Sequence, residues 1–178
     1  FLGEKEIPAE VYYGIQTMRA VENFPITGYK VNEEMIRALA MIKKAAALAN
    51  MDTKRLYEGI GNAIVKASDE VIDGKWHEYF IVVPIQGGAG TSMNMNINEI
   101  VANRALELMG HKKGDYVHVS PNSHVNMSQS TNDVFPTAIH LSTLRLLEQL
   151  IQTMTKMSTV LKNKAKQFDH VIKMGRTH

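Results

Sequence analysis

Hydrophobic residues along this chain recur mostly every three or four positions, which is the spacing of one face of an α-helix. Two polar residues, Asn32 and Asp52, stand just before such series and can cap the helices that follow them. Gly74 lies where a helix end favours a left-handed residue, although Gly59 and Gly61 could divide the second helix in two. The apolar positions of the two series are Met35, Ile36, Leu39, Ile42, Ala46 and then Leu56, Ile60, Ile64, Val65, Val71, Ile72. The pattern therefore predicts a mainly α fold.

Two shorter helices and one very long helix complete this pattern. The short helices are predicted over 15–23, ending before Phe24-Pro25, and over 96–109, with Asn96 as its cap. The long helix is predicted over 137–168, roughly four and a half heptads or about 48 Å at 1.5 Å per residue. Its apolar positions are Leu144, Leu147, Ile151, Met154, Leu161, Ala165 and Phe168. A helix of this length needs partner helices, from further chain or from other subunits.

We expect a small N-terminal domain over residues 1–132, with short extended pieces, and the truncated beginning of a long-helix bundle over 133–178. The continuous apolar run 80–85 predicts a strand, and the glycine loop 87–91 follows it. This loop does not bind a nucleotide by a known fingerprint, because Met93 replaces the third glycine and no P-loop lysine is present. It is either a turn or a loop whose N–H groups hold a small anion.

Composition and charge argue against several classes of function. Lys and Arg total 20 against 18 Asp and Glu, which argues against nucleic acid or a membrane surface as partner. The chain has no Cys, which excludes disulfides and thiolate chemistry and favours a cytoplasmic protein. Its seven histidines show no metal-ligand spacing, so neither a metal site nor a cofactor is predicted. The first residue is not Met, and the polar end has no tail-like character, so we expect a piece of a longer protein.

The polar run Ser128-Gln129-Ser130-Thr131-Asn132-Asp133 is the densest candidate chemistry. Short hydroxyl and amide side chains before a long helix can cap that helix, or they can help its free N–H groups to hold an anion. The residues alone leave both uses open.

Three segments in order make the chain resemble a known family: Gln86 to Ser92, Ser128 to Asp133, and Met174-Gly175-Arg176-Thr177-His178. Together with Val11-Tyr12-Tyr13-Gly14 and Glu22-Asn23-Phe24, they resemble the N-terminal part of the aspartase/fumarase superfamily. The resemblance is closest to its ammonia-eliminating members, and it implies reversible elimination of ammonia from L-aspartate to give fumarate through an aci-carboxylate. It also implies a homotetramer with active sites built from three chains, and no metal or organic cofactor.

The resemblance also implies roles for single residues. Thr91, Ser130 and Thr131 are expected to bind the β-carboxylate, whose extra negative charge in the intermediate needs hydrogen-bond donors. Asn132 is expected to bind the ammonium group with Thr177 and His178, and Thr177 also reaches the α-carboxylate. These residues need not meet within one chain. The family's general base is a Ser on a downstream loop that this sequence lacks, so we expect the chain alone to be inactive.

Two alternatives stay open. A class II fumarase forms the same intermediate but expels water; it typically has Ser, Gln and Ser at the positions of Ala89, Ser92 and Thr131. The run 120–123 also departs from the fumarase His-Pro-Asn-Asp motif. Alternatively, the chain is an inactive helical assembly module whose polar runs only cap helices. The resemblance, with its bundle shared by four subunits, also implies that the truncated 137–168 helix exposes its apolar positions and drives self-association.

Overall fold

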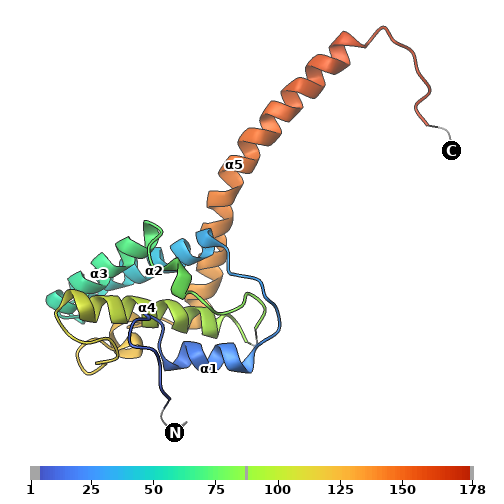
Figure 1. The fold of residues 1–178 in the computed structure, drawn as a ribbon. Helices are drawn as coiled ribbons and strands as arrows, with labels where there is room; N and C mark the ends of the chain where they lie inside the picture. Colours follow the sequence, from blue (N-terminus) through green and yellow to red (C-terminus); the bar gives the residue numbers. More distant parts are fainter. Residues whose placement is uncertain (1–4, 87, 177–178) are drawn as a thin grey trace. The chain divides into compact units, whose positions relative to one another are not determined.

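The computed structural model describes residues 5–86 and 88–176 of the chain (Figure 1). Its elements are the helices α1 (Ile15–Asn23), α2 (Glu33–Asp52), α3 (Glu58–Ile72), α4 (Thr91–Leu108) and α5 (Thr131–Gln167), with a 3-10 turn η1 (His77–Tyr79) and a π turn η2 (Pro121–Val125). The described residues contain no strand, which confirms the predicted mainly α fold. None of the helices in this described part is long and apolar enough to cross a membrane.

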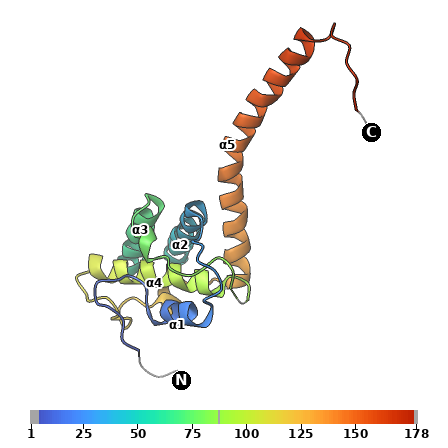
Figure 2. The same cartoon turned by 45° about the vertical axis from the view of Figure 1, so that its right-hand side comes forward.

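The chain divides into two compact units, Phe1–Ser142 and Thr143–His178. In the first unit α2 and α3 pair with each other, and α4 packs against both while α1 covers its other side (Figure 2). Helix α4 is the centre of the core, because Ile97, Ile100, Val101 and Leu106 are all fully buried. The boundary between domains that the sequence suggests, after residue 132, stays a prediction.

The second unit consists of the remainder of α5 and the chain after it. Its apolar side chains are solvent-exposed in this chain, which confirms the exposure that the sequence predicts; they include Leu144, Leu147, Ile151, Met154, Leu161 and Phe168. Apolar positions that recur every three and four residues form a stripe suited to partner helices. Self-association through this stripe stays a prediction.

Helix α1 has the bounds that the sequence predicts, and α2 begins directly after Asn32, as predicted. Asn32 caps α2, since its side chain accepts a hydrogen bond from the N–H of Glu34. Helix α1 is held differently, by the buried carboxylate of Glu99 from α4. This carboxylate accepts from the N–H groups of Gly14 (2.8 Å), Gln16 (2.9 Å) and Thr17 (3.0 Å), and from the Thr17 hydroxyl (2.6 Å). A negative charge at a helix N-terminus also complements the helix dipole.

The predicted cap of the second helix is wrong, and the break that its glycines could have caused does not occur. Asp52 is the last residue of α2, and α3 starts six residues later, at Glu58. Gly59 and Gly61 lie within α3 and do not break it. A Cβ built on Gly61 would overlap the side chain of Met51, so this glycine lets α3 approach α2 closely. Gly74 is left-handed, with φ +94°, as predicted.

The predicted strand over 80–85 is also wrong. Its backbone has no partner strand, and an amide from α4 takes that place instead. The Asn96 side chain accepts from the N–H of Ile81 (3.0 Å) and donates to the carbonyl of Tyr79 (3.1 Å). Asn96 is therefore buried inside α4 and is not its cap. The cap position belongs to Gly90, six residues before the predicted cap Asn96, in the left-handed conformation with φ +83°.

Candidate active site

The starts of α4 and α5 meet within this one chain. The Asn94 amide of α4 donates to the Thr131 hydroxyl of α5 across 3.1 Å. A Cβ built on Gly90 would overlap the ring of Phe135, so the turn before α4 lies directly against the first turns of α5. The structure thus brings together Thr91, the first residue of α4, and the polar run that precedes and opens α5.

Both helix starts present hydrogen-bond donors. Gly90 has no side chain that could cap α4, so no cap side chain accepts from the first N–H groups of this helix. Ser130 caps α5, because its hydroxyl accepts from the N–H of Asn132 (3.2 Å). Thr91, Ser130 and Asn132 are exposed. Two positive helix-dipole ends and several hydroxyls therefore border the same exposed region, an arrangement suited to an anion.

A buried cation lies behind this region. The Lys43 side chain of α2 is 0% exposed, and its ammonium donates to three amide oxygens: Asn94 (2.7 Å), Asn126 (3.0 Å) and Gln129 (2.9 Å). Burial lowers the pKa of Lys43 to about 7. An ammonium group has only donors, so the amide groups around it must turn their oxygens toward it.

This orientation of the amide oxygens determines whether the Thr131 hydroxyl accepts or donates its hydrogen bond to Asn94. Because the Asn94 oxygen faces Lys43, its Nδ2 is left to donate, and it donates to the oxygen of Thr131. A hydroxyl that accepts at its oxygen keeps its own hydrogen for another acceptor. Thr131 is therefore held ready to donate a hydrogen bond, as a group that binds a carboxylate must be.

Sequence reasoning missed this supporting layer. Lys43 follows Ile36 and Leu39 at helical spacing, so it stands on the apolar face of its helix, and this position was a readable signal of a buried charge. Asn94 and Asn126 carried no comparable signal, because their partners are distant in sequence. Thr177 and His178, the other predicted site residues, lie outside the described residues.

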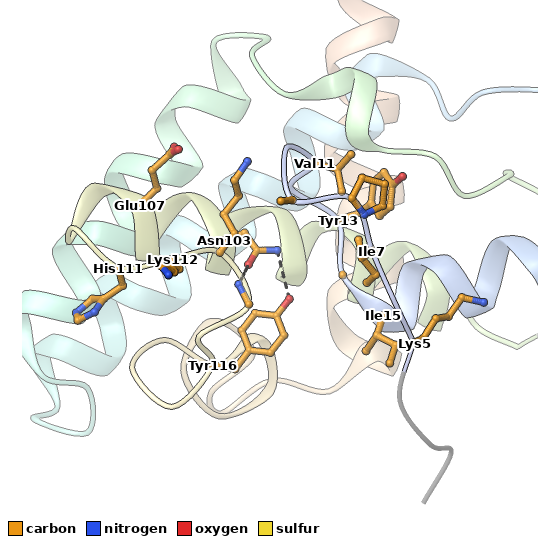
Figure 3. Close-up of a pocket in the computed structure, with 15 residues that line it drawn as sticks. Lys5, Ile7, Val11, Tyr13, Ile15, Asn103, Glu107, His111, Lys112 and Tyr116 are labelled. Carbon is orange, nitrogen blue, oxygen red and sulfur yellow. Dashed lines mark hydrogen bonds between the residues drawn. The ribbon is translucent and has the colours of Figure 1, made fainter.

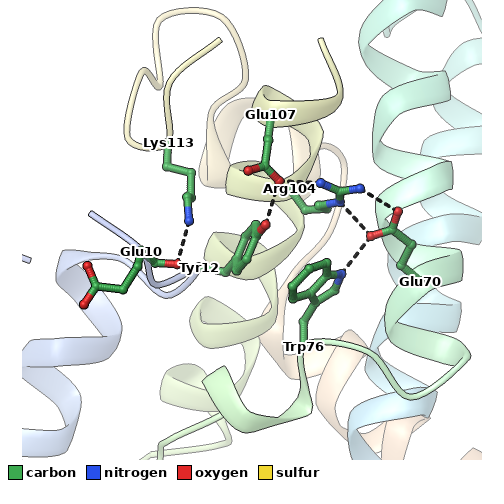
Figure 4. A network of polar contacts seen from close by, with 7 residues as sticks. All are labelled: Glu10, Tyr12, Glu70, Trp76, Arg104, Glu107 and Lys113. Atoms are coloured by element: carbon green, nitrogen blue, oxygen red, sulfur yellow. Dashed lines mark hydrogen bonds and ion pairs between the residues drawn. The ribbon is translucent and has the colours of Figure 1, made fainter. Parts of the chain in front are cut away.

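A second polar network joins the N-terminal segment to α3 and α4 (Figure 4). Arg104 binds both carboxylate oxygens of Glu70, at 2.6 and 2.9 Å, and also contacts Glu107. Trp76 donates to Glu70 (2.8 Å), and Tyr12 donates to Glu107 (2.6 Å). The Arg104 hydrogen bond lowers the pKa of Glu70, whereas burial raises the pKa of Tyr12 to about 12. Because every group has an internal partner, we interpret this network as structural.

A pocket of about 520 Å³ lies between the N-terminal segment and the second half of α4 (Figure 3). Asn103 and Tyr116 line it, together with Lys5 and Lys113. Asn103 is twelve residues after Thr91 on the same helix, which is about 18 Å at 1.5 Å per residue. The pocket is therefore separate from the place where the two helix starts meet.

Comparisons with known proteins find related lyases. A family model described as "Lyase" matches residues 3–178. The aspartate ammonia-lyase of Bacillus subtilis (strain 168) is 76% identical over 178 residues, which is 100% of this chain and 38% of the relative. Two solved structures cover 99% of this chain. The native fumarate lyase:delta crystallin of Brucella melitensis has a TM-score of 0.92 at 50% identity, with 42% of that chain covered. The class II fumarase of Schistosoma mansoni has a TM-score of 0.89 at 40% identity, with 38% covered.

The family match extends over nearly the whole chain, and the structural likeness includes the long helix as well as the core. The chain spans 38% of the length of the Bacillus subtilis relative. The three ordered motifs of the sequence predict the same assignment. The chain belongs to this lyase family, within the aspartase/fumarase superfamily.

Proposed function

We propose that the full-length protein carrying this chain eliminates ammonia from L-aspartate to give fumarate. One observation carries the proposal: the starts of α4 and α5 meet, joined by the Asn94–Thr131 hydrogen bond. The 76% identity to an aspartate ammonia-lyase supports the choice of reaction.

The chemistry explains why donors are needed at this place. Removal of the proton beside the β-carboxylate gives an aci-carboxylate, which gathers extra negative charge on its oxygens. Thr91, Ser130 and Thr131 would donate to these oxygens from two positive helix ends. Loss of one preorganised donor of this kind typically costs about 2.7–4 kcal/mol of transition-state stabilisation.

The remaining roles follow the family pattern. Asn132 would accept a hydrogen bond from the substrate ammonium together with Thr177 and His178, and Thr177 would also reach the α-carboxylate. Lys43 supports the donor role of Thr131 through Asn94 without touching the substrate. The general base would come from a later part of the protein, so the 178-residue chain alone should release no ammonia.

A homotetramer is part of the same proposal. The exposed apolar stripe of α5 is suited to packing against equivalent helices of other subunits. Analytical ultracentrifugation of the chain at rising concentration tests this, and a monomer throughout would contradict it.

The test of activity follows the ultraviolet absorbance of fumarate in the full-length protein, with L-aspartate and L-malate in parallel. Fumarate from aspartate alone is the expected result. Fumarate from malate alone would favour the second candidate, a class II fumarase, which the 40% identity to the Schistosoma enzyme keeps open. Absence of fumarate from both would favour an assembly module whose polar runs only cap helices.

A further inference from the structure

Three potential metal ligands converge in the loop between α4 and η2. They are the side chains of His111, Asp115 and His118, whose ligand atoms all lie within 4.8 Å of one another. The His118 Nε2 is already 3.6 Å from the Asp115 carboxylate. The two imidazole rings stack, with centroids 3.9 Å apart and an angle of 15° between their planes. This cluster lies outside the region where α4 and α5 begin.

The backbone that carries these side chains is fixed by hydrogen bonds to α4 and within the loop. After α4, Gly110 is left-handed (φ +81°) and the N–H of His111 bonds back to the carbonyl of Leu106 (2.9 Å). This is the Schellman arrangement, in which a glycine ends a helix and the residue after it is fixed against the last turn. The position of His111 is therefore set by the helix end.

The rest of the loop is anchored to α4 by one buried amide. Asn103 accepts from the N–H of Gly114 (2.8 Å) and donates to the Tyr116 hydroxyl (3.2 Å), as Figure 3 shows. A turn then joins the N–H of His118 to the carbonyl of Asp115 (3.1 Å). The loop backbone is thus fixed, while the Asp115 and His118 side chains are 41% and 49% exposed, which leaves them room to rotate.

Two lysines follow His111, and their charges bear on cation binding. Lys113 is turned away, since its ammonium donates to the carbonyl of Glu10 (2.6 Å) and lies 4.1 Å from the centroid of the Tyr12 ring (Figure 4). Lys112 is exposed, so water and salt screen its charge. Neither lysine therefore excludes a divalent cation from the cluster.

We propose that His111, Asp115 and His118 bind one divalent transition-metal ion of the zinc class. Two imidazole nitrogens and one carboxylate oxygen suit Zn²⁺ or Co²⁺ and not Ca²⁺ or Mg²⁺, which prefer oxygen ligands only. Ligand bonds of about 2.0–2.2 Å place neighbouring ligand atoms roughly 3.4 Å apart, so the side chains must close in by rotation. Water completes the coordination. This site is separate from the proposed elimination reaction.

Binding must also break the ring stack. The lone pair of an imidazole nitrogen lies in the ring plane, so two nearly parallel rings cannot both point at one ion. No sequence motif indicates this site, because its ligands are separated by four and three residues in an irregular loop and not along a helix. The expected signature is therefore metal binding together with a change in the environment of both rings.

The test is isothermal titration calorimetry with ZnCl₂ on the untagged, chelator-treated 178-residue chain, with CaCl₂ as the second titrant. We expect one Zn²⁺ per chain, no saturable Ca²⁺ binding, and an affinity for Zn²⁺ that falls about tenfold or more in His118→Ala and in Asp115→Asn. His140→Ala, which removes an exposed histidine from α5, is the matched control and should bind as the unchanged chain does.

Proton NMR of the histidine ring signals gives the second readout. At a Zn²⁺ concentration near the dissociation constant of the unchanged chain, Zn²⁺ should shift two histidines in that chain and should shift them much less in Asp115→Asn. The proposal is overturned by the absence of saturable Zn²⁺ binding, by equal affinity in His118→Ala, or by a loss of affinity in His140→Ala. Ca²⁺ binding as strong as Zn²⁺ binding would overturn the proposed preference for a transition metal.

Discussion

Glu99→Gln should destabilise the first unit strongly, because one buried carboxylate serves four donors at the start of α1. The carboxylate is 1% exposed and accepts from Gly14, Gln16 and Thr17. A glutamine replaces one oxygen by an NH₂ group. If its remaining oxygen takes the place of the oxygen that bonds Gly14 and Thr17, its NH₂ faces the N–H of Gln16, donor against donor.

The size of the effect follows from the lost interactions. One hydrogen bond to a charged acceptor contributes about 1.5–3 kcal/mol, and the charge at the helix N-terminus contributes about 0.3–1 kcal/mol more. The bonds that remain also weaken when the acceptor becomes neutral. We therefore expect the free energy of unfolding to fall by about 3–5 kcal/mol.

Urea unfolding followed by circular dichroism measures this change, in dilute samples because the stripe of α5 is exposed. Glu58→Gln is the matched control, since Glu58 also carries a negative charge in the first turn of a helix. It is exposed, and its ion pair with Lys54 at 3.4 Å is a surface contact, so its loss should stay within about 1 kcal/mol. A Glu99→Gln variant as stable as this control would refute the assignment of Glu99 as the cap of α1.

Three further changes test the candidate site. Lys43→Met removes the buried amine. The lysine keeps its proton up to about pH 10.4 in the unfolded chain, whereas its pKa in the fold is about 7. The stability of the unchanged chain relative to the variant should therefore rise between pH 7 and pH 9. The slope should be at most about 1.4 kcal/mol per pH unit, and chemical unfolding at three pH values that gave a flat difference would contradict it. Gly90→Ala should lower stability by more than about 2 kcal/mol, because φ is +83° and the new Cβ overlaps Phe135; a neutral result in thermal unfolding would argue against this contact. Thr131→Ala in the full-length protein should lower kcat about 100-fold or more, while Thr137→Ala, a change on the exposed face of the same helix, should leave it unchanged; equal losses in steady-state assays would remove Thr131 from the proposed site.

The helices with an amphipathic pattern could be predicted from the sequence, and the elements held by distant side chains could not. Asn32 caps α2 through a partner two residues away, so both groups of this interaction are visible together in the sequence. Residues 80–85 read as a strand because they are apolar, but their backbone pairs with Asn96 in another element. Propensity describes a segment alone, and here a tertiary contact determined its conformation.

The candidate site divides along the same line. The hydroxyls of Thr91 and of the 128–133 run could be predicted from local motifs. That they lie close together in one chain could not, because this depends on how α4 packs against the start of α5. The buried Lys43 explains why the Asn94 nitrogen donates to the Thr131 hydroxyl and the Asn94 oxygen does not face it. A neutral polar residue in its place could donate or accept, so the amides of Asn94, Asn126 and Gln129 would have no fixed orientation.

Protonated Lys43 removes this ambiguity, because an ammonium group can only donate. Each amide oxygen then faces inward to Lys43, and the Asn94 nitrogen is left facing Thr131. The cost of burying the charge is visible in the lowered pKa of Lys43, and the three amide acceptors offset part of it. A destabilising charge retained in a core is consistent with a need for orientation more than for stability. In this chain the group that it orients is the hydroxyl that the proposed reaction requires as a donor.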